Sequence, residues 1–154
     1  KCDAVKLEGG SLIISVIDHL IKNKIPVMGH LGILPQSVKG KFKFKGKKNS
    51  ERNKIFNDAK LLEKIGVFSI VLECVESTLA KQISKKLKIP TIGIGSSKFC
   101  DGQILVIDDL IGLNDTKVRF VKKFGQIKKN ISNAAKNFSK EVKNKKYPSK
   151  IYSY

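Results

Sequence analysis

Cysteine, tryptophan, arginine and acidic residues are all scarce in this sequence. The 154 residues include three cysteines (Cys2, Cys74 and Cys100), no tryptophan, and 13 acidic side chains against 31 basic ones. The odd number of cysteines and the absence of a CxxC spacing argue against a disulfide scaffold or a zinc site, so a reducing, cytoplasmic environment is expected. No apolar run approaches the roughly 18 residues of a membrane-spanning helix, so no membrane partner is expected.

The formal net charge of +18 raises nucleic acid as a class of partner. Only two of the 31 basic residues, Arg52 and Arg119, are arginines. The planar arginine fork recognises bases and phosphates best, whereas a lysine is a solvated point charge. Residues 39–48 hold six lysines and two phenylalanines, which fits either an exposed loop or a patch that binds a nucleic-acid backbone. We expect no specific nucleic-acid partner and keep a lysine-rich nucleic-acid-binding module as an alternative function.

Strand-like and helix-like segments alternate along the chain. Hydrophobic residues make up 41% of the sequence, enough to form a core. Apolar spacing predicts helices over 12–21 with Ser11 as the cap, 51–65, 77–87, and 116–145 with an interruption at Gly125. Short apolar runs predict strands over 4–8, 27–30, 67–73, 89–95 and 103–107. This alternation indicates right-handed βαβ units and a parallel sheet.

The fold class is therefore α/β, and five strands fit either a doubly wound sheet or part of a (β/α)₈ TIM barrel. Glu8, His30, Glu73 and Gly95 stand where strands end, and in a barrel the loops that follow build the active site. A complete barrel takes about 250 residues, so we expect an incomplete one. The expected domain is a partial barrel over 1–154, with barrel elements over 1–113, C-terminal helices over 114–145 and a tail over 146–154.

Lys6 and Glu8 lie two residues apart in a predicted strand, so their side chains point to the same side. Such a pair fits a cation for an anionic substrate beside a hard oxygen ligand for Mg²⁺. It also fits a structural ion pair near a strand end. The spacing leaves both interpretations open.

His30 and Glu73 are the other two candidate site residues. His30 stands between Gly29 and Leu31-Gly32 at a predicted strand end, where it is either a structural or an active-site histidine. Glu73 ends a nearly continuous apolar strand, and a partly desolvated carboxylate there has a raised pKa suited to a general base. A glutamate that turns out to solvent explains the same pattern.

Five ordered motifs resemble the ketopantoate hydroxymethyltransferase (3-methyl-2-oxobutanoate hydroxymethyltransferase) family. They run in the same order and spacing as in that family, over residues 4 to about 113. The motifs are VKLEGG at 5–10, PVMGHLG at 26–32 with PQS at 35–37, VLECV at 71–75, IPTIGIG at 89–95 and CDGQILV at 100–106.

This resemblance implies a (β/α)₈ barrel enzyme of pantothenate biosynthesis, usually a homodecamer. Family members transfer a one-carbon unit from 5,10-methylenetetrahydrofolate to C3 of 3-methyl-2-oxobutanoate, giving 2-dehydropantoate through a Mg²⁺-stabilised enolate. Carried over by position, Glu8 is a metal ligand, Lys6 binds the substrate, Glu73 is the proton acceptor and His30 has a supporting role. A related Mg²⁺-dependent carbon–carbon lyase barrel is a further alternative.

The sequence also departs from the pattern of the family. Glu76 replaces a common Pro, Asp108 a frequent His, and Ser96-Ser97 the usual Ala-Gly. The family's other two metal ligands are aspartates on strands that precede VKLEGG, so the chain corresponds to strands four to eight. We expect an N-terminally truncated fragment that is inactive alone, because one carboxylate is a poor site for Mg²⁺.

Overall fold

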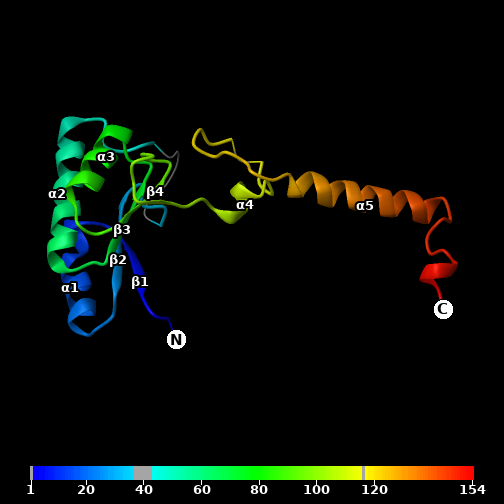
Figure 1. The fold of residues 1–154 in the computed structure, drawn as a ribbon, viewed down its shortest axis with the longest axis horizontal. Helices are drawn as coiled ribbons and strands as arrows, with labels where there is room; N and C mark the ends of the chain where they lie inside the picture. The colour runs from blue at the N-terminus through cyan, green and yellow to red at the C-terminus, as the bar shows by residue number, and fades with distance from the viewer. Residues whose placement is uncertain (1, 37–42, 116) are drawn as a thin grey trace. The chain divides into compact units, whose positions relative to one another are not determined.

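The apolar runs near the start of the chain form a parallel sheet. The structure, a computed structural model, describes residues 2–36, 43–115 and 117–154. The chain forms two compact units, Lys1–Ile104 and Leu105–Tyr154. Within the described residues the first unit holds a five-stranded sheet whose strands follow chain order (Figure 1). These strands are β1 (Val5–Glu8), β2 (Val27–Gly32), β3 (Ser69–Glu73), β4 (Thr91–Ile94) and β5 (Gly102–Gln103).

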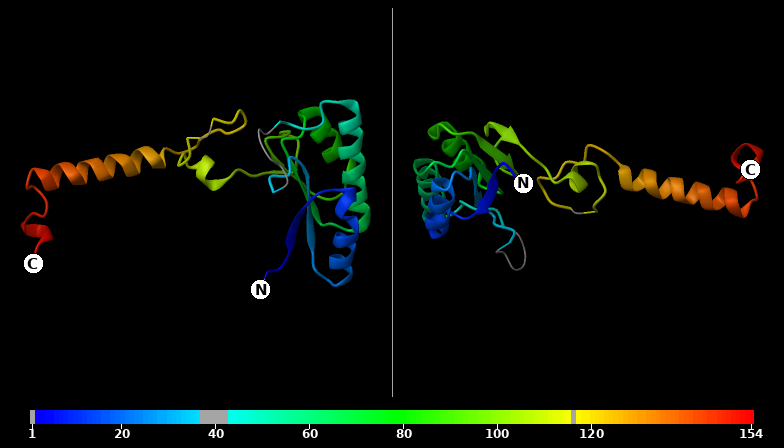
Figure 2. Two further views of the ribbon diagram at one scale, coloured as in Figure 1. Left: turned by 180° about the vertical axis from the view of Figure 1, so that it is seen from behind. Right: turned by 90° about the horizontal axis from the view of Figure 1, so that it is seen from below.

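Three helices cover one face of this sheet, as Figures 1 and 2 show. They are α1 (Ile14–Lys22), α2 (Asn49–Ile65) and α3 (Ser77–Lys86). All neighbouring strands pair in parallel, so each connection is a crossover. Crossovers share one handedness, and the strands are added in one direction across the sheet. The helices in these crossovers therefore lie on the same face. The predicted α/β class with a parallel sheet is confirmed.

Side chains that alternate along each strand separate this helix-covered face from the opposite one. On the helix-covered face Leu7, Leu31 and Leu72 join a buried apolar cluster with residues of the helices. The alternate positions, including Lys6, His30 and Glu73, project from the opposite face because successive side chains point to opposite sides. The polar side chains of β1, β2 and β3 therefore lie together on the opposite face, beside Val71.

The second unit contains α4 (Ile107–Leu110), α5 (Ile127–Lys143) and a 3₁₀ turn at Lys150–Tyr152. No residue of α5 is buried within the described residues. The ring of Phe138, in α5, makes an edge contact with that of Tyr147, after the helix, with centroids 5.4 Å apart. Across residues 2–36, 43–115 and 117–154, no helix combines the length and apolarity needed to cross a membrane.

Three predicted elements differ from the structure by more than their bounds. The strand predicted over 103–107 is wrong beyond Gln103, because residues 107–110 turn into α4, whose first turn carries Asp108 and Asp109, the charge favoured at a helix start. Ser11 does not cap a helix with its side chain; its backbone N–H donates to Asp58 Oδ1 at 3.2 Å, and α1 begins at Ile14.

The long helix predicted from 116 is also wrong in its first third. Thr116 lies outside the described residues, and residues 117–126 are not helical. The Phe124 and Gly125 N–H groups donate to Leu110 O at 2.8 and 3.2 Å, so they are not free for helical hydrogen bonds. Helix α5 therefore starts only at Ile127. Part of the basic segment at 39–48 and Ser37 of the second motif likewise lie outside the described residues.

Candidate functional site

The ends of three adjacent strands bring all four predicted site residues together. Lys6 and Glu8 come from β1, His30 from β2 and Glu73 from β3. Glu8 is in register with His30, and Glu73 with Gly32, two residues beyond His30. Strand β2 thus extends two residues further than predicted, and this extension carries its pairing up to the level of Glu73.

His30 is the centre of this cluster. Its Nδ1 lies 3.3 Å from Lys6 Nζ and 3.8 Å from Glu8 Oε1, and its Nε2 lies 3.1 Å from Glu73 Oε2. The His30 side chain is 1% exposed, whereas those of Glu8 and Glu73 are 10% and 19% exposed. The buried imidazole therefore separates a lysine from a partly open carboxylate.

The position of the ring proton on His30 follows from its neighbours. Burial, together with the nearby Lys6 ammonium, lowers the pKa of His30 from 6.5 to about 4, so the ring is neutral at pH 7. An ammonium only donates, so Nδ1 accepts from Lys6 and the proton lies on Nε2. Nε2 approaches Glu73 without the alignment of a hydrogen bond, and it has no hydrogen-bond partner among the described residues. A buried donor left in this way is suited to a ligand.

Glu73 has the properties of a general base. Burial raises the pKa of its carboxyl above 4.5; the Lys6 charge opposes this rise and the Glu8 charge adds to it. A carboxylate whose proton affinity is raised by partial desolvation is a better proton acceptor than a solvated one. Glu73 faces the cluster and does not turn out to solvent.

Glu8 offers a hard oxygen at the mouth of the cluster. Its Oε2 accepts a hydrogen bond at 3.1 Å from the N–H of Gln36, in the loop after β2. This bond ties the carboxylate to that loop. Such an oxygen suits Mg²⁺. Over the described residues, no group of three or more His, Cys, Asp or Glu side chains gathers to hold a metal ion. Glu8 can therefore supply one ligand of a magnesium site, and the described residues do not complete it.

A cavity of about 340 Å³ opens beside Glu8. Its walls come from the turn after β1, the end of β2 and the first half of α2, and they include Gly10, Lys45, Lys54 and Asp58. A second cavity, of about 420 Å³, lies in the C-terminal unit and contains none of the predicted site residues. The first cavity is thus the one that adjoins the cluster.

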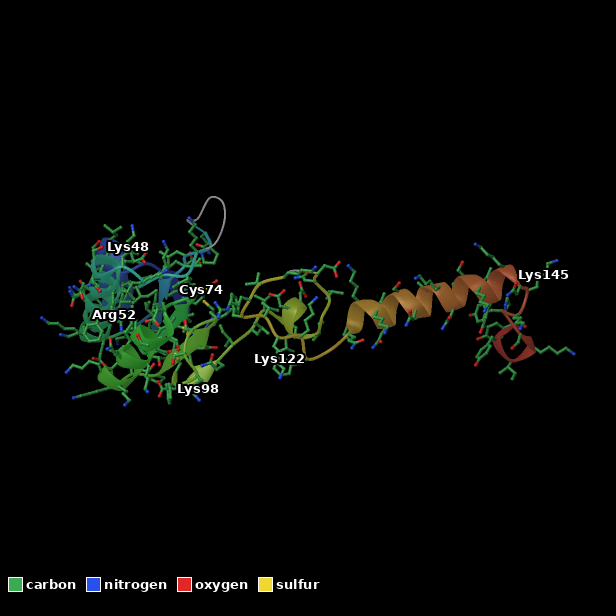
Figure 3. The ribbon with its side chains drawn as sticks, turned by 90° about the horizontal axis from the view of Figure 1, so that it is seen from above. Lys48, Arg52, Cys74, Lys98, Lys122 and Lys145 are labelled. Atoms are coloured by element: carbon green, nitrogen blue, oxygen red, sulfur yellow. The ribbon has the colours of Figure 1, made fainter. Side chains whose placement is uncertain are left out.

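The strand end at Glu73 is held by contacts that the sequence pattern did not reveal. Cys74, labelled in Figure 3, has a left-handed backbone with φ +50, unusual for a residue other than glycine. The Cys74 N–H donates to Ile94 O at 2.8 Å, and the Ile33 N–H donates to Glu73 O at 2.9 Å. Ser96 also bonds this segment. The departure from Ala-Gly at 96–97 was the available signal for Ser96.

Comparison with known proteins identifies the family of the chain. The model of a family described as ketopantoate hydroxymethyltransferase matches residues 1–150. A relative named 3-methyl-2-oxobutanoate hydroxymethyltransferase, from Pelagibacter ubique, is 64% identical over 154 residues, which are 100% of this chain and 60% of the relative. Relatives of the same name from Clostridium botulinum and Pseudothermotoga lettingae are each 48% identical, over 98% and 95% of this chain and 56% of their own lengths. The chain spans between 56% and 60% of these relatives, and it belongs to the ketopantoate hydroxymethyltransferase family.

Proposed function

We propose that this chain supplies the base, the substrate-binding cation and one metal ligand of a 3-methyl-2-oxobutanoate hydroxymethyltransferase. The reaction transfers a one-carbon unit from 5,10-methylenetetrahydrofolate to C3 of 3-methyl-2-oxobutanoate and gives 2-dehydropantoate. The observation that carries the proposal is the partly buried Glu73 carboxylate, 3.1 Å from His30 and next to Lys6 and Glu8. The names of the relatives support the choice of substrates.

Each side chain of the cluster has a role in the proposed reaction. Lys6 attracts the carboxylate of the keto acid and so orients its C3 toward β3. Glu73 accepts the C3 proton, which is acidic because C3 adjoins the ketone carbon. The Nε2–H of His30, which has no hydrogen-bond partner among the described residues, is free to donate to an oxygen of the substrate.

Glu8 would hold Mg²⁺ in the complete site, with its other ligands supplied from outside the described residues. When bound, Mg²⁺ supplies Lewis-acid stabilisation of negative charge on the oxygens of the keto acid. The inactivity of residues 1–154 alone stays a prediction, as do the truncation of the chain, its cytoplasmic location and the homodecamer.

The arrangement of the sheet supports a partial (β/α)₈ barrel. In a doubly wound domain the helices cover both faces of the sheet, whereas here α1, α2 and α3 lie on one face and the strands follow chain order. Barrels place active-site residues at the carboxyl ends of several strands. Glu8 and Glu73 end β1 and β3, as this proposal requires.

A chimaera tests the role of Glu73. This chain replaces the matching residues of the Pelagibacter ubique relative, and exchange of the C3 proton of 3-methyl-2-oxobutanoate is followed by NMR in deuterated water. Glu73→Gln is expected to lower exchange to background while Mg²⁺ binding, measured by calorimetry, is retained, because an amide does not accept the proton. In the unsubstituted chimaera, exchange should rise with pH through a pKa above 4.5.

The control is Glu141→Gln on α5, which makes the same chemical change in the C-terminal unit and should leave the exchange rate unchanged. Wild-type exchange in Glu73→Gln would remove Glu73 from the base role. Product formation that does not depend on methylenetetrahydrofolate would instead indicate the lyase alternative.

A further inference from the structure

We propose that Ser96 is a positioning residue for Glu73. Its hydroxyl bridges the backbone on both sides of Glu73 and Cys74 and so fixes the end of β3. The catalytic part of this inference rests on the proposed function, because it takes Glu73 as the base.

The Ser96 hydroxyl makes two hydrogen bonds to the β3 segment. It donates to Leu72 O at 2.7 Å and accepts from the Val75 N–H at 3.0 Å. A hydroxyl has one proton to donate and lone pairs to accept, so both bonds form at once. The bridge spans from the residue before Glu73 to the residue after Cys74.

The backbone of this segment depends on the bridge. Val75 is 2% exposed and Leu72 is fully buried. Without the hydroxyl, the Val75 N–H would lose this acceptor in a buried place, which is costly. The other groups of the segment are bonded elsewhere: Glu73 O accepts from Ile33, and Cys74 O accepts from Lys45. None of these bonds replaces the contact at Val75.

The backbone inside the span of the bridge is strained. Cys74 holds φ +50, a conformation that persists for such a residue only where its surroundings fix it. The strain lies between Glu73 and Val75, inside the span of the hydroxyl. Ser96 itself follows Gly95, whose φ of +63 turns the chain back from the end of β4 toward β3. Relaxation of Cys74 would rotate the peptide that carries Glu73.

The test compares two serine-to-alanine substitutions in the chimaera, each of which removes one hydroxyl. Ser96→Ala should lower kcat for C3-proton exchange by about tenfold or more, because misplacing a reacting group by a fraction of an ångström is costly. KM for the keto acid should change by less than about threefold, because Lys6 is untouched. Ser96→Thr keeps the hydroxyl and should restore kcat.

Ser97→Ala is the matched control. Ser97 is buried, and its Oγ accepts from the Phe99 N–H at 3.3 Å, a bond outside the β3 segment. This variant loses one buried hydroxyl and should keep kcat. Equal losses in Ser96→Ala and Ser97→Ala, or wild-type kcat in Ser96→Ala, would overturn the proposal.

Amide hydrogen exchange on the 154-residue chain separates this proposal from the proposed function. The Val75 amide should be protected in the unsubstituted chain and should exchange at least about tenfold faster in Ser96→Ala. Rapid exchange of the Val75 amide in the unsubstituted chain would by itself overturn the proposal that the Ser96 hydroxyl holds this segment. If the unsubstituted chimaera shows no C3-proton exchange, the proposed function fails, and the amide data alone decide whether Ser96 holds the segment.

Discussion

Gly32, at the end of β2, determines how closely β2 approaches Glu73. Its φ is +102, and a Cβ at this position would overlap the Glu73 carbonyl oxygen and lie 2.8 Å from Val75 Cγ2. Gly66, after α2, has a nearly equal φ of +99, but a Cβ there would be 3.9 Å from its nearest neighbour, Ile21. The two glycines therefore share a positive φ, which strains any residue with a Cβ, and differ in the space around them.

This pair yields a stability prediction. Gly66→Ala should lower the free energy of unfolding by about 1 kcal/mol, the cost of a left-handed alanine. Gly32→Ala should cost a further 1–3 kcal/mol, roughly the cost of overpacking. In the chimaera, on the proposed role of Glu73, it should also reduce C3-proton exchange by displacing Glu73. Urea unfolding of both variants measures the difference. Equal losses of unfolding free energy in the two variants would show that the Glu73 carbonyl moves aside at no measurable cost.

Single residues of the site were predictable where they follow strand alternation. The proximity of Lys6, Glu8, His30 and Glu73 was predictable because the ends of parallel strands are readable from the sequence. Ser96 and Gly32 were not found as site residues, because their importance arises from contacts between the ends of neighbouring strands. No local periodicity encodes such contacts.

Helix α3 begins with a capping residue, Glu76, whose role was not predicted from the sequence. The sequence showed Glu76 only as a departure from the proline common in the family. Glu76 precedes the helix, and its carboxylate accepts from the Thr78 and Leu79 N–H groups at 3.0 Å each. Arg52, labelled in Figure 3, binds the same carboxylate from α2 at 2.9 Å. The residue thus begins α3 and ties it to α2.

The cap predicts a pH dependence of stability. Hydrogen bonds from the Thr78 hydroxyl and N–H, with others from Arg52 and the Leu79 N–H, lower the pKa of Glu76 from 4.5 to about 2. The folded state therefore binds this proton less readily than the unfolded chain. The contribution of the cap is fully present above pH 4.5 and is lost as the pH falls toward 2.

Glu76→Ala should lower the free energy of unfolding by about 1–2 kcal/mol at pH 7, the range for a lost helix cap. The difference from wild type should shrink between pH 4.5 and 2 in chemical unfolding experiments. Ser77→Ala, at the next and exposed position, is the control and should show neither effect. A difference that stays constant down to pH 2 would exclude the ionised cap.

Elements were predictable where burial sets their period, and less so elsewhere. Helices α2 and α3 agree with the prediction to within two residues because each packs an apolar side on the sheet. Between residues 117 and 126 the apolar spacing is helical, yet backbone bonds to Leu110 take precedence. Tertiary hydrogen bonds of this kind override a local pattern.

At the scale of the whole chain, the charge of +18 bears on association with polyanions. Of the two arginines, Arg52 is engaged by Glu76, Thr78 and Gln82 within the fold. The remaining positive charge is almost all lysine, which attracts phosphates without reading sequence.

We therefore expect weak, non-specific binding to duplex DNA. Fluorescence anisotropy with two unrelated duplexes should give equal affinities, with log K falling linearly against log salt. The alternative function as a nucleic-acid-binding module predicts a preference of at least about tenfold for one sequence near physiological salt. Such a preference would contradict the assignment of the lysines to general surface charge.

The cluster forms only when β1, β2 and β3 pair in the correct register, so it can report on correct folding. Each strand contributes at least one side chain, and a slip of β2 by one residue would turn His30 to the helix-covered face. A refolded sample with β2 displaced would keep its helix and strand content and still lack the cluster. If Glu73 acts as proposed, C3-proton exchange per molecule of chimaera would then count only molecules in which the three strands have paired correctly, which circular dichroism does not distinguish.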